Sequence, residues 1–229
     1  MSQRRALIVG ASRGLGLGLV RRFLECGWDV TATVRRPSEA LAELSATGPL
    51  RIEEDVDIDD DAAVLRLRTA LAEVPDFDLV FVVAGVATQA GTPAALLPRE
   101  IATAIFQTNA LSPIRFAETF HRRVRLGGLI VLMTSKLGSV SLNRGGGWSS
   151  YRASKAALNT LARSFMGQHS GADWGVVLMH PGWVKTDLGG RRATLDVETS
   201  AQGMVEVLEA QLGQRGCTFL DYAGQTVPW

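Results

Sequence analysis

A short apolar run followed by closely spaced glycines, near the start of the chain, most constrains what this protein can fold into. Residues 6–9 read as a buried strand, the next seven are Gly-Ala-Ser-Arg-Gly-Leu-Gly, and a helical pattern covers residues 17–26. Such a turn forms a phosphate cradle, because backbone amides and the positive helix end face an anion that side chains would obstruct. Glycine turns also occur in unrelated loops, but the position at the first strand-to-helix junction favours a nucleotide site.

Strand-like and helical segments alternate along the rest of the chain. Further apolar strands are expected at residues 29–34, 50–56, 77–84, 128–134, 175–179 and 217–220, with long helices over residues 98–125 and 199–212. This order predicts an α/β fold, a doubly wound Rossmann-like domain with a parallel sheet of about seven strands and helices on both faces. A length of 229 residues suffices for one core, so a single domain over residues 1–229 is expected.

Composition narrows the compartment and the partners. The net charge is +1, from 24 basic and 23 acidic residues without a basic block, so neither a nucleic acid nor an anionic membrane partner is expected. Cys26 and Cys217 lie far apart and read as reduced thiols, and the apolar run at residues 6–9 is too short for a signal peptide or a membrane span. A cytoplasmic protein is predicted.

A tyrosine and a lysine four residues apart suggest proton transfer. Tyr151 and Lys155 share one face of a predicted helix, and Ser135 ends the strand expected at residues 128–134. Lowering a tyrosine pKa by ~3 units requires roughly 4 kcal/mol, which one cation at ~4 Å supplies at an effective dielectric of ~20. We therefore expect Lys155 to lower the pKa of Tyr151, and Ser135 to hydrogen-bond the oxygen that Tyr151 protonates. The alternative is an exposed tyrosine stacked on a lysine stem.

The second strand ends in arginines rather than the acidic residue that binds the ribose of NAD in many dinucleotide folds. Arg35, with Arg13 from the glycine turn, would suit the 2′-phosphate of NADP. The alternative is a solvated basic loop. Asp55 is expected at the end of the third strand, where an adenine amino group would bind.

Other polar residues have simpler interpretations. Residues 59–61 are three aspartates, more typical of the acidic first turn of a helix than of a metal site, and no metal site is predicted. Asn109, inside a predicted helix, indicates a kinked turn, a bound water or merely a helix surface. His180 is expected to be a strand-end side chain without a catalytic role.

With these residues in view, the chain resembles the short-chain dehydrogenase/reductase family over residues 6–229. The motifs that carry the resemblance follow the family's order and approximate spacing: Gly10, Gly14, Gly16, Asn109, Ser135, Tyr151, Lys155, Pro181 and Gly182. The resemblance implies a catalytic tetrad of Asn109, Ser135, Tyr151 and Lys155. In it Ser135 polarises a carbonyl, Lys155 also holds the nicotinamide ribose, and Asn109 positions a water that resupplies the proton.

Within the family the chain is most similar to the C-factor and sniffer-type carbonyl reductases, which use NADPH. The stretches behind this are residues 13–20, 180–187 and 195–197 and the final Pro-Trp. The resemblance implies that NADP(H) is bound by Gly10, Ser12, Arg13, Gly14, Leu15, Gly16, Arg35, Asp55, Val56, Ala84, Gly85, Asn109, Tyr151, Lys155, Pro181, Gly182, Val184 and Thr186.

One position departs from the family pattern. Where the family usually has Asn-Asn-Ala-Gly after the fourth strand, this chain has Val82 and Val83 before Ala84 and Gly85. The change removes side-chain hydrogen bonds that tie neighbouring strands, so cofactor binding is expected to survive but to weaken by ~1 kcal/mol.

The expected activity is hydride transfer between NADPH and a carbonyl compound, with a small-molecule substrate. An apolar substrate pocket is predicted from Leu137, Leu142, Trp148, Trp183 and Leu188, which favours a hydrophobic ketone or aldehyde. The alternative is an NADP-binding regulatory or signalling protein with vestigial activity. The resemblance also suggests a homo-oligomer.

Overall fold

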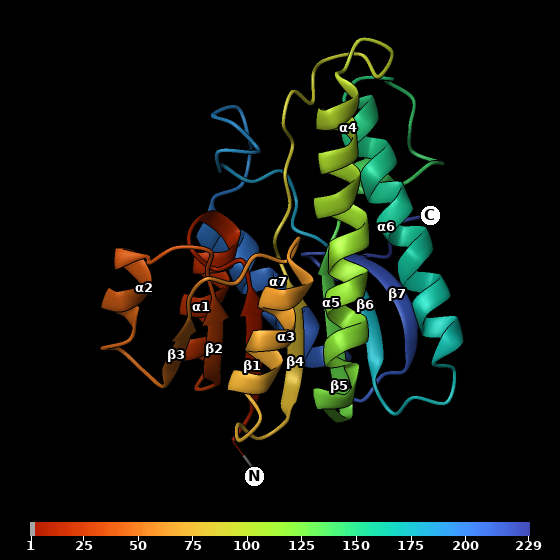
Figure 1. The fold of residues 1–229 in the computed structure, drawn as a ribbon. Coiled ribbons are helices and arrows are strands. Elements are labelled where there is room, and N and C mark those ends of the chain that lie inside the picture. The colour runs from red at the N-terminus through yellow and green to blue at the C-terminus, as the bar shows by residue number, and fades with distance from the viewer. Residues whose placement is uncertain (1–2) are drawn as a thin grey trace.

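The computed structural model describes residues 3–229, and its centre is one parallel sheet of seven strands (Figure 1). The strands are β1 (Arg5–Val9), β2 (Asp29–Thr33), β3 (Leu50–Glu53), β4 (Phe77–Val82), β5 (Val124–Met133), β6 (Gly175–His180) and β7 (Gly216–Asp221). Their order across the sheet is β3-β2-β1-β4-β5-β6-β7. The predicted α/β class and the parallel sheet are confirmed.

Helices cover both faces of this sheet, as predicted. They are α1 (Gly14–Glu25), α2 (Glu39–Leu44), α3 (Asp61–Ala70), α4 (Arg99–Phe106), α5 (Ser112–Phe120), α6 (Ser149–Gln168) and α7 (Val197–Gln211). The buried side chains of α3, α5 and α6 join one apolar cluster, and those of α1, α2 and α7 join another on the opposite face. Parallel strands read as continuous apolar runs because both of their faces are covered in this way.

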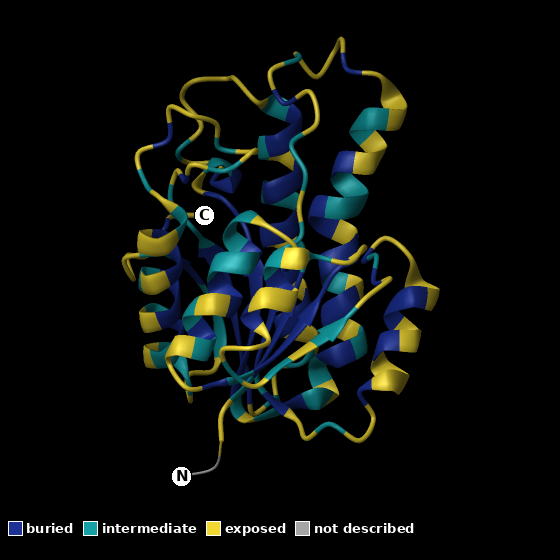
Figure 2. Ribbon diagram, turned by 90° about the vertical axis from the view of Figure 1, so that its left-hand side faces the viewer, coloured by how far each residue is buried: buried dark blue, intermediate teal, exposed yellow. Residues whose placement is uncertain are grey.

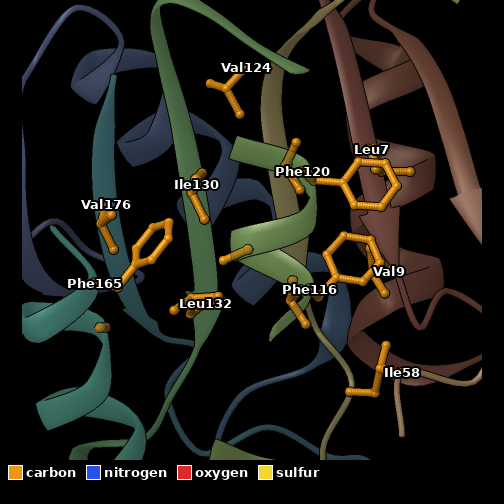
Figure 3. Packing of buried hydrophobic residues seen from close by; sticks show 14 of the residues in the cluster. Leu7, Val9, Ile58, Phe116, Phe120, Val124, Ile130, Leu132, Phe165 and Val176 are labelled. Atoms are coloured by element: carbon orange, nitrogen blue, oxygen red, sulfur yellow. The ribbon is translucent and has the colours of Figure 1, made fainter. Parts of the chain in front are cut away.

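The two clusters account for most of the buried interior, which appears dark blue around the sheet in Figure 2. On the α5 face, Phe116 and Phe120 stack with ring centroids 4.5 Å apart, and Figure 3 shows them next to Leu7 and Val9 of β1. Burying each such aromatic side chain contributes roughly 1.5–3 kcal/mol. This packing fixes α5 and α6 against the sheet and thereby positions the residues at the amino-terminal ends of both helices.

The single long helix predicted over residues 98–125 is partly wrong. After α4 the chain makes a π-helical turn (Gln107–Leu111), continues as α5, and ends in a 3₁₀ turn (His121–Arg123). Strand β5 then begins at Val124, earlier than predicted. A register shift against β4 and a positive φ of 75° at Gly127 accommodate the glycine pair within the strand. Of the alternatives for Asn109, the kinked turn is confirmed.

The aspartates at residues 59–61 act at the start of α3. Asp60 caps the helix by accepting a hydrogen bond from the amide of Ala62, and Asp61 lies in the first turn, as predicted. Asp59 instead accepts hydrogen bonds from the hydroxyls of Thr108 and Ser112. These bonds attach the loop after β3 to the π-helical turn.

The strand order reverses direction between β1 and β4, which are neighbours in space but not in sequence. In open parallel sheets, ligands bind in the crevice outside the carboxyl ends of the strands at such a switch point. Among the described residues, no helix has both the length and the apolarity needed to cross a membrane.

Candidate active site

A cleft of about 760 Å³ runs along the carboxyl ends of the strands, at the switch point. Its lining comes from the loops after β1 to β6, the end of β5, the π-helical turn, the first turn of α1 and the first two turns of α6. The lining residues are Gly10, Ser12, Arg13, Gly14, Leu15, Gly16, Val34, Arg35, Val56, Asp57, Ile58, Asp59, Val83, Ala84, Gly85, Val86, Ala87, Thr88, Thr108, Met133, Thr134, Tyr151, Lys155, Pro181, Lys185, Thr186, Asp187 and Leu188.

The glycine turn brings the start of α1 directly against β1. A Cβ atom on Gly16 would lie 2.2 Å from the carbonyl oxygen of Gly10, so only glycine allows this approach. Helix α1 begins after Arg13, which makes no side-chain cap, and its first turn contains no acidic residue. The amides of that first turn have no partner within the helix, so together with the helix dipole they suit an anionic group.

Two arginines lie at this end of the cleft, and each faces a carboxylate. Arg13 Nη1 is 2.7 Å from Asp187 Oδ2, and Arg35 Nη1 is 3.8 Å from Asp57 Oδ2. All four side chains are exposed, and exposed ion pairs of this kind contribute only ~0–1 kcal/mol. Both arginines can therefore exchange these partners for another anion at little cost. Neither aspartate was singled out in the sequence, because the pairs join distant segments.

At the other end of the cleft, Tyr151 and Lys155 lie on the same face of α6, as their spacing predicts, and both are buried. Lys155 Nζ lies 6.0 Å from the centroid of the Tyr151 ring and donates a 2.9 Å hydrogen bond to the carbonyl oxygen of Met133. Ser135 lies two residues after the end of β5 and is buried. Its Oγ accepts a hydrogen bond from the amide of Leu137, and its side chain is placed to hydrogen-bond the Tyr151 oxygen. The three predicted groups are therefore brought together.

The predicted effect of Lys155 on Tyr151 is wrong for this structure. Burial raises the pKa of Tyr151 to about 12, and the hydrogen bond with Ser135 only opposes this rise. Burial likewise lowers the pKa of Lys155 to about 7. Removing water disfavours the charged form of both groups, and the ammonium is held by a backbone carbonyl rather than by the phenol. Tyr151 consequently carries its proton at neutral pH.

Asn109 links the π-helical turn to the two neighbouring segments. Its Nδ2 donates to the carbonyl oxygen of Val86 at 2.8 Å and to Ser154 Oγ at 3.0 Å, and its Oδ1 accepts from the amide of Val86 at 2.8 Å. Ser154 in turn donates to the carbonyl oxygen of Tyr151. Both hydrogens of the Asn109 amide are used, so any water held by this side chain must be a donor to Oδ1.

The two valines that depart from the family pattern do not separate the strands. The backbone amides of Val83 and Ala84 both donate to the carbonyl oxygen of Val9, at 2.9 and 3.2 Å. Next to them, a Cβ on Gly85 would lie 3.3 Å from Lys155 Nζ and 3.2 Å from Asn109 Oδ1. Backbone hydrogen bonds therefore tie β4 to β1, and a glycine keeps the cleft open beside the lysine.

Most of the residues predicted to bind the cofactor line the cleft. Four of those predictions fall outside its lining: Asp55, Asn109, Gly182 and Val184. Strand β3 ends at Glu53, so Asp55 lies in a left-handed turn at φ 56°, whereas its neighbour Val56, also predicted, lines the cleft. Val184 is buried in a bridge to Leu195 and shapes the loop after β6.

The predicted apolar pocket is only partly assembled. Leu188 lines the cleft, and the Trp148 ring meets the Tyr151 ring edge-on with centroids 5.7 Å apart. Trp183 is exposed and donates to the carbonyl oxygen of Gly189, and Leu137 is half-buried just after Ser135. Leu142, in the loop before α6, packs instead against the core cluster on the α6 face.

His180 is not part of the cleft lining. Burial is the largest cause that lowers its pKa, to about 4, against the opposing charge of Asp221. The side chain is therefore neutral at physiological pH.

A family model described as short chain dehydrogenase matches residues 4–195 of the chain. The chain belongs to the short-chain dehydrogenase family. Among the relatives of this short-chain dehydrogenase is C-signal of Myxococcus xanthus, which is 40% identical over 126 residues, covering 54% of this chain and 76% of that protein.

Solved structures resemble the same chain over its full length. A short-chain dehydrogenase/reductase from Burkholderia multivorans with bound NADP is 39% identical, with a TM-score of 0.94 and 100% of each chain covered. A carbonyl reductase from Pseudomonas aeruginosa in complex with NADP is 38% identical, with a TM-score of 0.91 and the same coverage. Together with the carbonyl reductase Sniffer of D. melanogaster (29% identity, TM-score 0.86, both chains fully covered), they confirm the predicted branch of the family.

Proposed function

We propose that this short-chain dehydrogenase is an NADPH-dependent carbonyl reductase in which Tyr151 delivers the proton. The observation that carries the proposal is the pairing, in one cleft, of a helix end that suits an anion with a buried tyrosine whose pKa is raised. The reverse reaction needs the phenolate as a base, and a pKa of about 12 makes that form scarce at neutral pH. At neutral pH Tyr151 is therefore in the form that a proton donor needs.

NADP(H) fits the residues present. The uncapped first turn of α1 suits a pyrophosphate, and Arg13 with Arg35 suits a 2′-phosphate once the two aspartates release them. Two similar solved structures hold NADP, which supports the same cofactor here. When bound, the cofactor supplies the hydride.

The chain's own residues would handle the proton and the carbonyl. Ser135 would donate a hydrogen bond to the substrate oxygen, and Tyr151 would transfer its proton to that oxygen. As negative charge develops on the phenol, it favours the charged form of Lys155, because opposite charges stabilise one another in a site that excludes water. Asn109 would act as a positioning residue that fixes α6 through Ser154.

The surroundings of Tyr151 support an apolar carbonyl substrate. Trp148 lies against the tyrosine ring, Leu188 lines the cleft, and Trp183 is exposed on the loop that carries Leu188. These side chains offer contact area and few hydrogen-bonding groups, so a hydrophobic ketone or aldehyde is the proposed substrate class.

Replacement of Tyr151 by phenylalanine tests the proposal. Tyr151→Phe should reduce kcat for a panel of aromatic and aliphatic ketones and aldehydes by roughly a thousandfold or more, while NADPH binding measured by fluorescence stays within about threefold. Tyr222→Phe, which removes the only other tyrosine, is the matched control and should keep its activity. A Tyr151→Phe protein with normal turnover would refute the acid assignment.

The likeness to C-signal favours a second candidate, an NADP-binding signalling protein with vestigial turnover. The assembled group of Ser135, Tyr151 and Lys155 argues against it. A carbonyl panel with NADPH and an alcohol panel with NADP separate the two. Tight cofactor binding without turnover in either panel would favour signalling.

A further inference from the structure

Two of the three histidines of the chain meet beside a glutamate, far from the cleft. His121 lies in the 3₁₀ turn just before β5, His169 ends α6 shortly before β6, and Glu118 lies in the last turn of α5. One ligand atom from each of these three residues lies within 4.8 Å of the others. Because β5 and β6 begin here, the group lies at the amino edge of the sheet, opposite the cleft.

A hydrogen bond orients the ring of His121. Its Nδ1 lies 2.8 Å from the carbonyl oxygen of Glu118. A carbonyl oxygen can only accept, so Nδ1 carries the hydrogen and Nε2 keeps the free lone pair. Histidines that bind metals commonly donate their other ring N–H to a backbone carbonyl in this way, which fixes both the tautomer and the ring orientation.

The second histidine shares the side chain of the same glutamate. His169 Nε2 lies 3.2 Å from Glu118 Oε2. Again the oxygen accepts, so a proton lies between the two atoms, and a divalent cation at this position would replace that proton and bind both atoms. Two imidazoles and one carboxylate form a ligand set known for zinc, with water in the fourth position. Exposure of Glu118 leaves space for that water.

Aromatic packing holds both rings in place before any ion binds. The His121 and His169 rings have centroids 4.5 Å apart, and the Trp174 ring lies 6.1 Å from the first and 5.7 Å from the second. Phe165 packs on His169 at 4.7 Å and stacks on Trp174. In a tetrahedral zinc site the ligand atoms are ~3.4 Å apart, given bonds of ~2.1 Å. His169 Nε2 and Glu118 Oε2 already have this spacing, at 3.2 Å. The remaining contraction, from a separation of at most 4.8 Å, therefore concerns His121.

We propose that Glu118, His121 and His169 bind a divalent transition metal ion of the zinc class. The ion would fasten the end of α5 to the end of α6, the helix that carries Tyr151 at its other end. It would therefore act on stability rather than on the reaction. No local sequence pattern predicts this site, because strand β5 and helix α6 separate the two histidines.

Calorimetric titration of the metal-free full chain with Zn²⁺ tests the proposal, with Co²⁺ absorbance as a spectroscopic report of nitrogen ligands. One ion per chain should bind, and saturating Zn²⁺ should raise Tm. His121→Gln and His169→Gln should weaken binding at least a hundredfold and abolish the rise in Tm. Glu118→Gln, on an exposed position that tolerates substitution, should weaken binding about tenfold.

Matched controls distinguish a built site from general affinity of surface groups for zinc. His180→Gln removes the third histidine and Glu100→Gln removes an exposed glutamate of α4, and both should bind Zn²⁺ like the unchanged protein. Two results would overturn the proposal: absence of saturable binding at one ion per chain, or equal weakening by His180→Gln and His169→Gln. Circular dichroism of each variant confirms that it is folded.

Discussion

The two ends of the cleft differ in how they hold their charges. At the glycine turn, Arg13 and Arg35 are exposed and paired with exposed carboxylates. Beside α6, Tyr151 and Lys155 are buried, and Lys155 is held by a backbone carbonyl. Water screens the charges of the two exposed arginines. At the buried end, the exclusion of water sets the pKa values of Tyr151 and Lys155.

This difference suits the exposed end of the cleft to cofactor recognition and the buried end to the chemical step. Exposed arginines lose little when they exchange one anion for another, so they can select a cofactor without rigid surroundings. Buried groups respond strongly to one new charge or one lost hydrogen bond, because the interior screens such changes weakly. Substitutions at the buried end should therefore have larger effects than substitutions at the exposed end.

The largest expected effect follows replacement of the buried ammonium. Lys155→Met should lower kcat about a thousandfold, because no cation then stabilises the charge that develops on Tyr151. The free energy of unfolding should not fall, since a buried ammonium is costly to desolvate. Lys185→Met, an exposed lysine lining the same cleft, is the control and should change kcat less than fivefold. An equal loss of kcat in the two variants would show that burial does not make the Lys155 end of the cleft more sensitive to substitution.

The protonation of Tyr151 is the second test. In a Tyr222→Phe protein Tyr151 is the only tyrosine, so ultraviolet absorbance of the phenolate reports it alone. Burial raises the pKa of Tyr151 to about 12, so the phenol should stay protonated up to pH ~11. Compared with the ordinary pKa of ~10, its acid dissociation constant is then about a hundredfold smaller.

Adding Lys155→Met to the same protein sharpens this test. Because burial lowers the pKa of Lys155 to about 7, the lysine is neutral in the pH range where Tyr151 ionises. Its removal should therefore leave the titration unshifted. Phenolate appearing below pH 10, and moving upward on Lys155→Met, would show that the ammonium does lower the tyrosine pKa.

At the exposed end, Arg35→Asp should weaken NADPH binding by roughly ten- to a hundredfold, the range expected for one lost charge-assisted contact and an added repulsion. NADH, which lacks the 2′-phosphate, should bind as before. Arg36→Ala, an exposed neighbour outside the cleft lining, is the control and should leave both affinities unchanged. Equal losses for NADPH and NADH would place the 2′-phosphate elsewhere.

The smallest effect is expected from the partner of Arg13. Asp187→Ala frees the arginine from an exposed ion pair, so NADPH should bind about two- to fivefold more tightly, corresponding to ~0.5–1 kcal/mol. The gain should vanish at 1 M salt, where such charges are screened over ~3 Å. Weaker NADPH binding in this variant would show that Asp187 supports the arginine rather than competing with its ligand.

Local sequence predicted the elements of the fold well and their ends less well. Apolar runs predicted the strands, because parallel strands buried on both faces leave continuous apolar segments. The helix after the glycine turn was predicted from residue 17, whereas α1 begins at Gly14. The predicted helix over residues 98–125 hid the π-helical turn at Asn109, which depends on hydrogen bonds to Val86 and Ser154. The predicted end of β3 also differs from the structure, where the strand stops at Glu53, before Asp55.

The sequence alone determined which groups meet on one helix face. Tyr151 and Lys155 are four residues apart in α6, and residues at this spacing lie on the same face of a helix. Only the tertiary structure decided how readily those two groups ionise. Their depth of burial sets their pKa values, and for Tyr151 the shift is opposite to the predicted one. It also decided that Arg13 meets Asp187 and that His121 meets His169, since such contacts join segments that only folding brings together.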